Sequence, residues 1–216
     1  MNALFQDRAD AGRQLAAALL ALPHDEGTIV LALPRGGVPV GYEVACALHA
    51  PLDVAIVRKL GAPQNKEYAM GAIASGGVII VDKEMVQAMG VTDSALNAIV
   101  ETERAELLRR EQTYREGRPP PNIDGRSLVI VDDGIATGAT MRAAIAAIKK
   151  HRPGSIVVAV PVAAGDTLEA IKAEVNDVVC LATPSPFRAV GLWYASFQQT
   201  TDRQVGELLA KARGPG

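Results

Sequence analysis

The chain has 216 residues, a length that fits one α/β domain. Hydrophobic residues make up 49% of it and charged residues 21%, an ordinary globular composition that excludes a disordered protein. The formal net charge is −2, from 22 Lys and Arg against 24 Asp and Glu. Because a general nucleic-acid-binding protein needs an excess of positive charge, we do not expect nucleic acid as a partner.

Cysteine usage and the hydropathy pattern indicate the compartment. Cys46 and Cys180 stand in apolar segments, which predicts two buried thiols in a reducing environment rather than a disulfide. The apolar run over residues 15–22 is too short to span a bilayer, and mixed charges precede it, unlike a secretory signal. We therefore expect a cytoplasmic protein with no membrane segment.

The first half of the chain alternates between helical and strand patterns. Apolar residues at helical spacing predict helices, and continuous apolar runs predict strands buried on both faces. The predicted helices cover residues 8–22 and 38–49, and the predicted strands cover residues 28–33, 52–57, 70–75 and 78–81. Polar residues over 60–69 predict a loop, and Gly76 and Gly77 predict a hairpin turn between the two short strands.

The alternation resumes after a long helix predicted over residues 92–117. Strands are predicted over 127–131, 155–162 and 178–182, and helices over 137–151, 167–175 and from about 202. Strands that alternate with helices predict an α/β fold with a parallel sheet and helices on both faces. We predict one domain over residues 1–216, with a Rossmann-like core over about 27–183. Prolines and aromatic residues over 184–199 predict a small hood, with the terminal helices packed alongside.

The most specific motif is residues 131–140, which read VDDGIATGAT. An apolar strand ends there in Asp132 and Asp133, at the edge where open parallel sheets bind ligands. The glycines and threonines of the following loop are Gly134, Thr137, Gly138 and Thr140. Backbone N–H groups, hydroxyls and a helix N-terminus in such a loop can bind a phosphate, whereas the two carboxylates suit sugar hydroxyls or a Mg²⁺ ion. The residues alone therefore predict a site for a phosphorylated sugar.

This motif resembles the 5-phosphoribosyl-1-pyrophosphate (PRPP) signature of the type I phosphoribosyltransferases, in wording closest to the adenine phosphoribosyltransferases. The similarity in strand order extends over about residues 27–183. The resemblance implies that Asp132 and Asp133 are catalytic, bind the ribose hydroxyls, and contact Mg²⁺ indirectly or through PRPP. It also implies a set of residues that bind the 5′-phosphate: Gly134, Ile135, Ala136, Thr137, Gly138, Ala139 and Thr140.

Two further segments resemble the pyrophosphate-binding parts of that family. Arg35, Gly36 and Gly37 follow a predicted strand, where the Arg offers a charge-assisted fork and the glycines permit close approach. Arg58 and Lys59 follow the next strand, and Lys59 is expected to act in catalysis on the departing pyrophosphate. Taken alone, the segment at Arg35 is equally consistent with a turn at the end of a strand that carries a surface Arg. Taken alone, Arg58 and Lys59 are equally consistent with strand-end residues whose charged ends reach the solvent. The loop over 60–70, which contains Lys66 and Glu67, would cover the reacting centre.

The hood loosely resembles the base-stacking segment of hypoxanthine-guanine phosphoribosyltransferases. The candidate base-binding residues are Phe187, Val190, Trp193 and Tyr194. Aromatic faces can stack on a base, and the alternative is that these rings pack the hood on the sheet. Ala136 and Ala195 stand where that family has acids, so no carboxylate that acts on a purine ring is identified.

The resemblance implies a Mg²⁺-dependent enzyme that transfers ribose 5-phosphate from PRPP to a nitrogenous base and releases pyrophosphate. A purine is favoured over uracil or another heterocycle, and a homodimer fits the base rate for such proteins. The alternative is a non-catalytic protein that senses PRPP or a nucleotide on the same fold, because no general base stands out.

Overall fold

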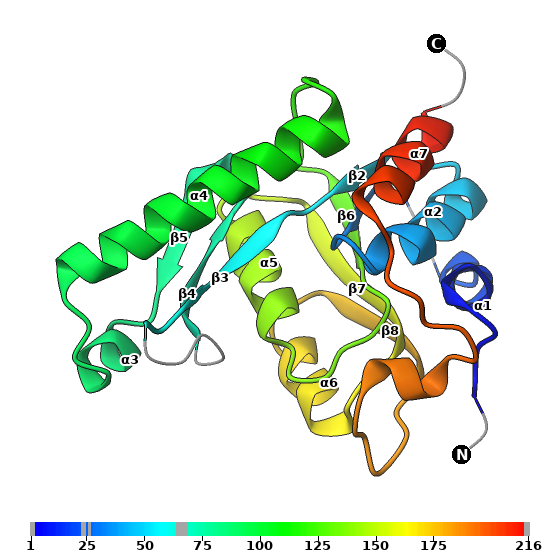
Figure 1. The fold of residues 1–216 in the computed structure, drawn as a ribbon. Coiled ribbons are helices and arrows are strands. Elements are labelled where there is room, and N and C mark those ends of the chain that lie inside the picture. The colour runs from blue at the N-terminus through cyan, green and yellow to red at the C-terminus, as the bar shows by residue number, and fades with distance from the viewer. Residues whose placement is uncertain (1–2, 23–24, 26, 64–68, 214–216) are drawn as a thin grey trace.

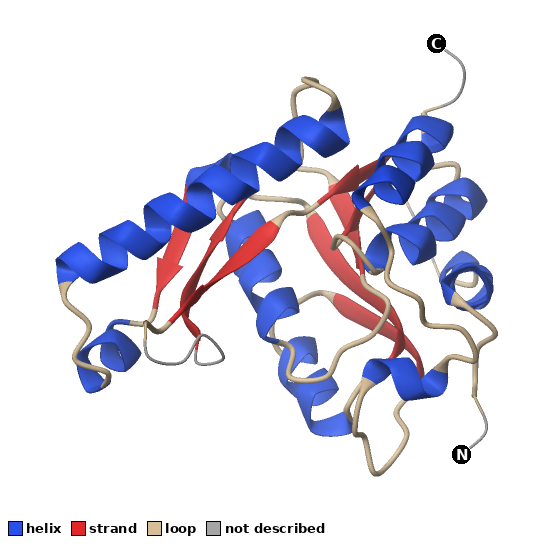
Figure 2. Ribbon diagram, viewed as in Figure 1, coloured by secondary structure: helices blue, strands red, loops and turns tan. Residues whose placement is uncertain are grey.

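The computed structural model describes residues 3–22, 25, 27–63 and 69–213 (Figure 1). A five-stranded sheet with the order β2-β1-β6-β7-β8 forms its centre (Figure 2). Its strands are β1 (Ile29–Ala32), β2 (Leu52–Val54), β6 (Ser127–Val131), β7 (Ser155–Val162) and β8 (Asp177–Ala182). Every neighbouring pair is parallel, as the alternation of strands and helices predicts. The predicted α/β fold class is thereby confirmed.

Helices cover both faces of this sheet (Figure 1). One face carries α1 (Arg8–Leu20), α2 (Gly37–Leu48) and α7 (Asp202–Ala212), and the other carries α5 (Ala139–Lys149) and α6 (Gly165–Lys172). Successive strand residues point to opposite faces. Val30 therefore packs in the core with α1, α2 and α7, whereas Leu31 packs in the core with α5 and α6. Burial on both faces explains why the strands read as continuous apolar runs.

A second, antiparallel sheet stands beside the core (Figure 2). Its strands are β3 (Val57–Gly61), β4 (Ala69–Ala74) and β5 (Val78–Val81). The short 3-10 turn η1 (Ser75–Gly77) joins β4 to β5, and α3 (Lys83–Ala88) follows β5. The long helix α4 (Asp93–Arg115) lies across this sheet, where Leu107 packs in one cluster with Leu60 and Ile73. The predicted hairpin of the two short strands is confirmed.

The predicted strand over 52–57 is wrong, because the chain leaves the core sheet after Val54 and enters the second sheet at Val57. Ala55 and Ile56, which connect the sheets, are buried, so the apolar run continues without a break and hides the division. Part of the predicted loop over 60–69 belongs to β3 and β4, and residues 64–68 lie outside the described residues.

Two smaller predictions also fail for local reasons. The helix predicted from residue 137 begins at Ala139, because Gly138 has a φ of 74° and cannot continue a right-handed helix. Cys46 is exposed and Cys180 is half-buried, although both were predicted to be buried. Val44, Ala45 and Leu48 form the core-facing side of α2, and Cys46 lies on another side of that helix.

The hood contains η2 (Val190–Trp193) and is built from two distant parts of the chain. Backbone N–H groups of Leu4 and Phe5 donate to the carbonyl of Trp193, at 2.8 and 3.0 Å. The N–H of Ala195 donates in return to the carbonyl of Phe5, at 2.8 Å. Phe5 and Tyr194 thus form a short parallel bridge, which holds the segment before α1 against the segment before α7.

Candidate active site

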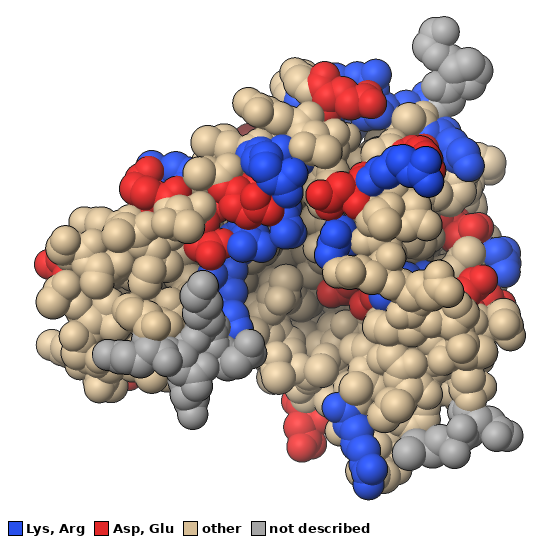
Figure 3. Space-filling view, in the orientation of Figure 1, with Lys and Arg blue, Asp and Glu red and all other residues tan. Residues whose placement is uncertain are grey.

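The two predicted acids lie at the carboxyl end of β6, the middle strand of the core sheet. Asp132 Oδ1 accepts a hydrogen bond from the backbone N–H of Asp133, at 2.8 Å. Arg8 Nε donates to Asp133 Oδ2 at 2.7 Å, and the hydroxyl of Tyr194 donates to the backbone carbonyl of Asp133 at 2.5 Å. A hollow opens between the core and the antiparallel sheet, with Lys and Arg side chains along its rim (Figure 3).

Burial makes this acid pair unfavourable in its ionised form. Burial and the neighbouring Asp133 carboxylate together raise the pKa of Asp132 well above its usual range. Burial also raises the pKa of Asp133, and the Arg8 guanidinium opposes that rise. Acids whose ionised form is destabilised by burial are typical of functional sites. Such acids lower the stability of the fold, so a role in function explains why they are present.

We expect Asp132→Asn to stabilise the protein at pH 7. A carboxyl whose pKa is raised in the folded state binds its proton more tightly there than in the unfolded chain, so stability falls as pH rises through the folded pKa. Asn carries no charge, and its Oδ1 can still accept from the N–H of Asp133. The gain should disappear below about pH 4, where the carboxyl of the unfolded chain is protonated as well.

The measurement for Asp132→Asn is the free energy of unfolding in urea at a series of pH values. Asp177→Asn is a matched control, since the exposed Asp177 accepts the same kind of bond from the next N–H, at 2.7 Å. An equal gain in the two variants would show that burial of Asp132 does not lower stability.

The predicted phosphate loop is fixed to the neighbouring strand. The N–H of Ile135 donates to the carbonyl of Val162 at 2.9 Å, and Thr167 Oγ1 donates to the carbonyl of Ala136 at 2.8 Å. Ile135 is only 2% exposed, so it anchors the loop and its N–H is already used, contrary to its predicted role as a phosphate ligand. The exposed residues at the start of α5 are Ala136, Thr137, Ala139 and Thr140. They leave the helix N-terminus open to an anion.

The predicted pyrophosphate loop packs directly against the acids. A Cβ on Gly36 would lie 1.9 Å from Asp133 Oδ2, and a Cβ on Gly37 would lie 2.7 Å from the carbonyl oxygen of Val131. Only glycine permits this approach. The peptide bond between Pro34 and Arg35 is cis, and Arg35 Nη1 lies 3.8 Å from Asp202 Oδ1 at the start of α7. The structure thus brings Gly36 and Gly37 beside the acid pair.

The basic pair of the second sheet lies within β3, so neither residue ends a core strand. Both residues line a cavity of about 490 Å³ beside α4, where Arg58 binds Glu103 through Nε at 2.7 Å and Nη2 at 2.6 Å. Lys59 also lines a second cavity, of about 420 Å³, together with Thr137 and Thr140 of the phosphate loop. The structure thus brings Lys59 close to the phosphate loop, whereas Arg58 is held by α4.

Two of the four predicted base-binding residues are core residues. Trp193 is 7% exposed and Tyr194 is 5% exposed, and both pack in a cluster with Phe5. Their rings therefore offer no free face to a base, and the alternative that they pack the hood is correct. Phe187 and Val190 are half-buried, and Val190 lies over Gly134, where an added Cβ would come within 2.5 Å of Val190 Cγ1. Val190 thus borders the acid loop.

Sequence reasoning missed Arg8 and Phe197. The Arg8 guanidinium lies 3.8 Å from the centre of the Phe197 ring, and Arg8 Nη1 donates to the carbonyl of Gln198 at 2.6 Å. No local signal marks Arg8, because it reads as the ordinary start of a helix. It reaches Asp133 across 125 residues of sequence.

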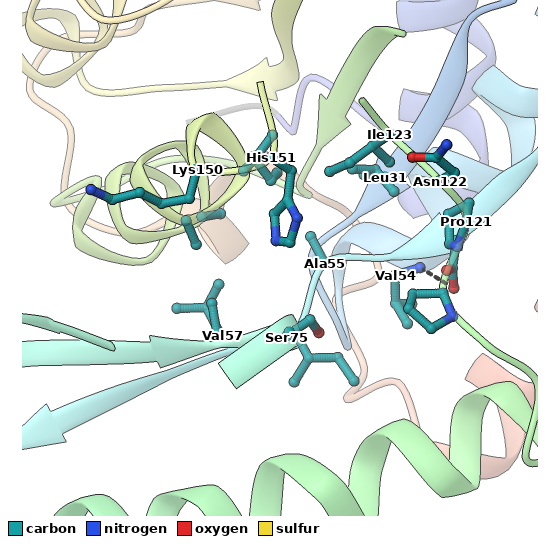
Figure 4. Close-up of a pocket in the computed structure, with 18 of the residues that line it drawn as sticks. Leu31, Val54, Ala55, Val57, Ser75, Pro121, Asn122, Ile123, Lys150 and His151 are labelled. Atoms are coloured by element: carbon teal, nitrogen blue, oxygen red, sulfur yellow. Dashed lines mark hydrogen bonds between the residues drawn. The ribbon is translucent and has the colours of Figure 1, made fainter. Parts of the chain in front are cut away.

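A further cavity lies away from the predicted site residues. A cavity of about 430 Å³ lies beside the end of α5, where His151, Ser75 and Val57 surround it (Figure 4). None of the predicted site residues is among the described residues that line it. Within the described ranges, no three His, Cys, Asp or Glu side chains are grouped to hold a metal ion, and no helix is long and apolar enough to cross a membrane.

A parallel sheet covered by helices defines an α/β protein, and the paired acids, the glycine loop and the open helix N-terminus make its carboxyl edge the candidate site. Residues 3–195 match the phosphoribosyl transferase domain, and the chain belongs to that family. The predicted resemblance to the phosphoribosyltransferases is thereby confirmed at the level of the family.

Individual relatives agree with the family assignment. A Mycobacterium tuberculosis protein with a provisional phosphoribosyl transferase name is 46% identical over 209 residues, which are 97% of this chain and 47% of that protein. The chain therefore spans about half the length of this relative. A uracil phosphoribosyltransferase of Lactobacillus gasseri is 29% identical over 79% of this chain and 82% of its own. The crystal structure of TT1426 from Thermus thermophilus superimposes with a TM-score of 0.84 at 42% identity, covering 96% of this chain and 98% of that one.

Proposed function

We propose that this protein transfers ribose 5-phosphate from PRPP to a nitrogenous base and releases pyrophosphate. The supporting observation is the meeting of three segments at one edge of the core sheet. Gly36 lies close to the carboxylate of Asp133. The exposed phosphate loop follows Asp133 in the chain and leads into α5. Lys59 joins the loop from the second sheet across a shared cavity. In this proposal Asp132 and Asp133 bind the ribose hydroxyls, and Thr137 and its neighbours bind the 5′-phosphate.

Positive charge on the pyrophosphate side would promote departure of the leaving group. Arg35 and Lys59 are the proposed cationic groups there, since charge that develops in the transition state is best met by groups already in place. In the proposed reaction, displacement at the anomeric carbon passes through an oxocarbenium-like state, and Asp132 and Asp133 would support its positive charge.

Mg²⁺ is part of this proposal. Asp132 and Asp133 supply the hard carboxylate oxygens that Mg²⁺ prefers, and Mg²⁺ usually combines one or two carboxylates with substrate phosphates and water. Because the described residues form no metal group of their own, the ion would bind together with PRPP. It would supply positive charge to the pyrophosphate oxygens.

A purine remains the first candidate for the acceptor, as the hood sequence predicts, and uracil is the second. Burial of Trp193 and Tyr194 leaves Phe187 and Val190 as the predicted residues available to a base. The L. gasseri relative acts, by its name, on uracil, and this supports including pyrimidines in the test.

The experiment is pyrophosphate release from PRPP and Mg²⁺ with a panel of purine and pyrimidine bases, against a control without base. Release that depends on one base would support the proposal and identify the acceptor. PRPP binding by calorimetry is measured in parallel. Absence of both release and PRPP binding would refute the proposal.

A non-catalytic sensor of PRPP or a nucleotide is the second candidate. The observation in its favour is the lack of an acid at Ala136 and Ala195, the two positions where the resembled family places one. PRPP binding without turnover of any base in the panel would favour the sensor. A ligand-dependent change in binding to a nucleic acid would then distinguish it from an enzyme with a rare acceptor.

A further inference from the structure

We propose that Arg8 is a positioning residue that holds Asp133 in place for ribose binding and connects it to the hood. The inference rests on the proposed function, because it concerns the acid assigned to the ribose. Arg8 lies on the first turn of α1, outside the motifs from which the site was predicted. Its role is therefore visible only in the folded chain.

The contacts of Arg8 fix its guanidinium on three sides. Nε donates to Asp133 Oδ2 at 2.7 Å, Nη1 donates to the carbonyl of Gln198 at 2.6 Å, and the ring of Phe197 lies 3.8 Å away. The side chain of Arg8 is 12% exposed and that of Asp133 is 14% exposed. A pair of charges this well covered is screened little by solvent, and its hydrogen bond is of the strong, charge-assisted kind.

Asp133 is in turn held from three parts of the chain. Arg8 binds its carboxylate, the Tyr194 hydroxyl binds its backbone carbonyl at 2.5 Å, and Gly36 closes against Oδ2. A carboxylate has about four lone-pair sites, so one bond to Arg8 leaves acceptors for sugar hydroxyls. Such fixation removes the entropy of side-chain rotation before the substrate arrives, which is how a preorganised site gains affinity.

The test compares Arg8→Gln and Arg8→Lys with the parent protein. We expect Arg8→Gln to weaken PRPP binding, measured by calorimetry, about tenfold or more, because a charge-assisted hydrogen bond is lost. KM for PRPP should rise by a similar factor, with little change in KM for the base. Arg8→Lys keeps the charge without the planar fork and should recover part of the affinity.

Arg13→Gln is the matched control. Arg13 lies on the same helix, its side chain is 59% exposed, and its nearest acid partners are 3.7 and 3.9 Å away. This variant should bind PRPP like the parent. Thermal unfolding of each variant shows whether it is folded, and if Arg8→Gln does not fold, the PRPP affinity and the KM for PRPP of Arg8→Lys decide.

Failure of the proposed function and failure of the role of Arg8 give different results in this experiment. A parent protein that does not bind PRPP would refute the proposed function. A parent that binds PRPP, beside a folded Arg8→Gln variant with the same PRPP affinity and the same KM for PRPP, would overturn the role of Arg8 alone. A double variant with Asp133→Asn adds a check, since Arg8→Gln should have little further effect on PRPP affinity once Asp133 is uncharged.

Discussion

Replacing Asp132 and Asp133 together with Asn is expected to reduce pyrophosphate release by at least ~10³-fold, because positioning of the ribose and support of its positive charge are lost at once. The fold should survive. Both acids have raised pKa values from burial, so the uncharged amides are tolerated at least as well. Loss of activity together with unchanged or higher stability would therefore separate a functional role from a structural one.

The measurement is the rate of pyrophosphate release with the best base of the panel, beside urea unfolding of the same preparation. Asp177→Asn serves again as the control, because Asp177 is exposed at the start of β8. A double variant that keeps the parent rate would show that the acid pair does not take part in the reaction.

Gly36→Ala is expected to lower the same rate by ~10²-fold, the usual effect of moving a reacting group by about an ångström. The new Cβ would lie 1.9 Å from Asp133 Oδ2, so the carboxylate or the loop must shift. The backbone of Gly36 has φ −62° and ψ −34°, which alanine adopts readily, so steric contact with the acid is the cause.

Gly206→Ala is the matched control for Gly36→Ala. Gly206 lies within α7, and an added Cβ there meets nothing within 4 Å. Alanine in a helix interior should raise stability by about 0.5–1 kcal/mol and leave activity unchanged. Parent-like activity of Gly36→Ala would mean that the loop at 34–37 does not need its close approach to Asp133.

The parts of the candidate site that could be predicted from the sequence are those whose residues lie in one contiguous segment. Asp132, Asp133 and the loop to Thr140 form a strand–loop–helix unit, so their types and order carry the information. The loop at Gly36 follows its strand in the same way. Because carboxyl ends of parallel strands meet at one edge, the two units could be placed together before the structure was known.

The remaining parts depend on contacts that no local pattern encodes. Ala55 and Ile56 connect the two sheets and are buried, like Val54 at the end of β2. The sequence therefore stays apolar where the chain passes from one sheet to the other, and no polar residue marks the change. An aromatic residue near a site can stack on a ligand or on its own hood, and burial alone shows that Trp193 and Tyr194 do the latter. Arg8 could not be found because its partner is 125 residues away.

The bridge between Phe5 and Tyr194 joins the start of the chain to a segment that is synthesised late, and this limits the order in which contacts can form during folding. During synthesis the acid loop leaves the ribosome long before residues 193–198, to which the first helix must attach. Until then Arg8 lacks the carbonyl of Gln198 and the ring of Phe197, its partners from the far end of the chain. The sheet can therefore form early, whereas the contacts of Arg8 with Gln198 and Phe197 can form only after the end of the hood has been synthesised.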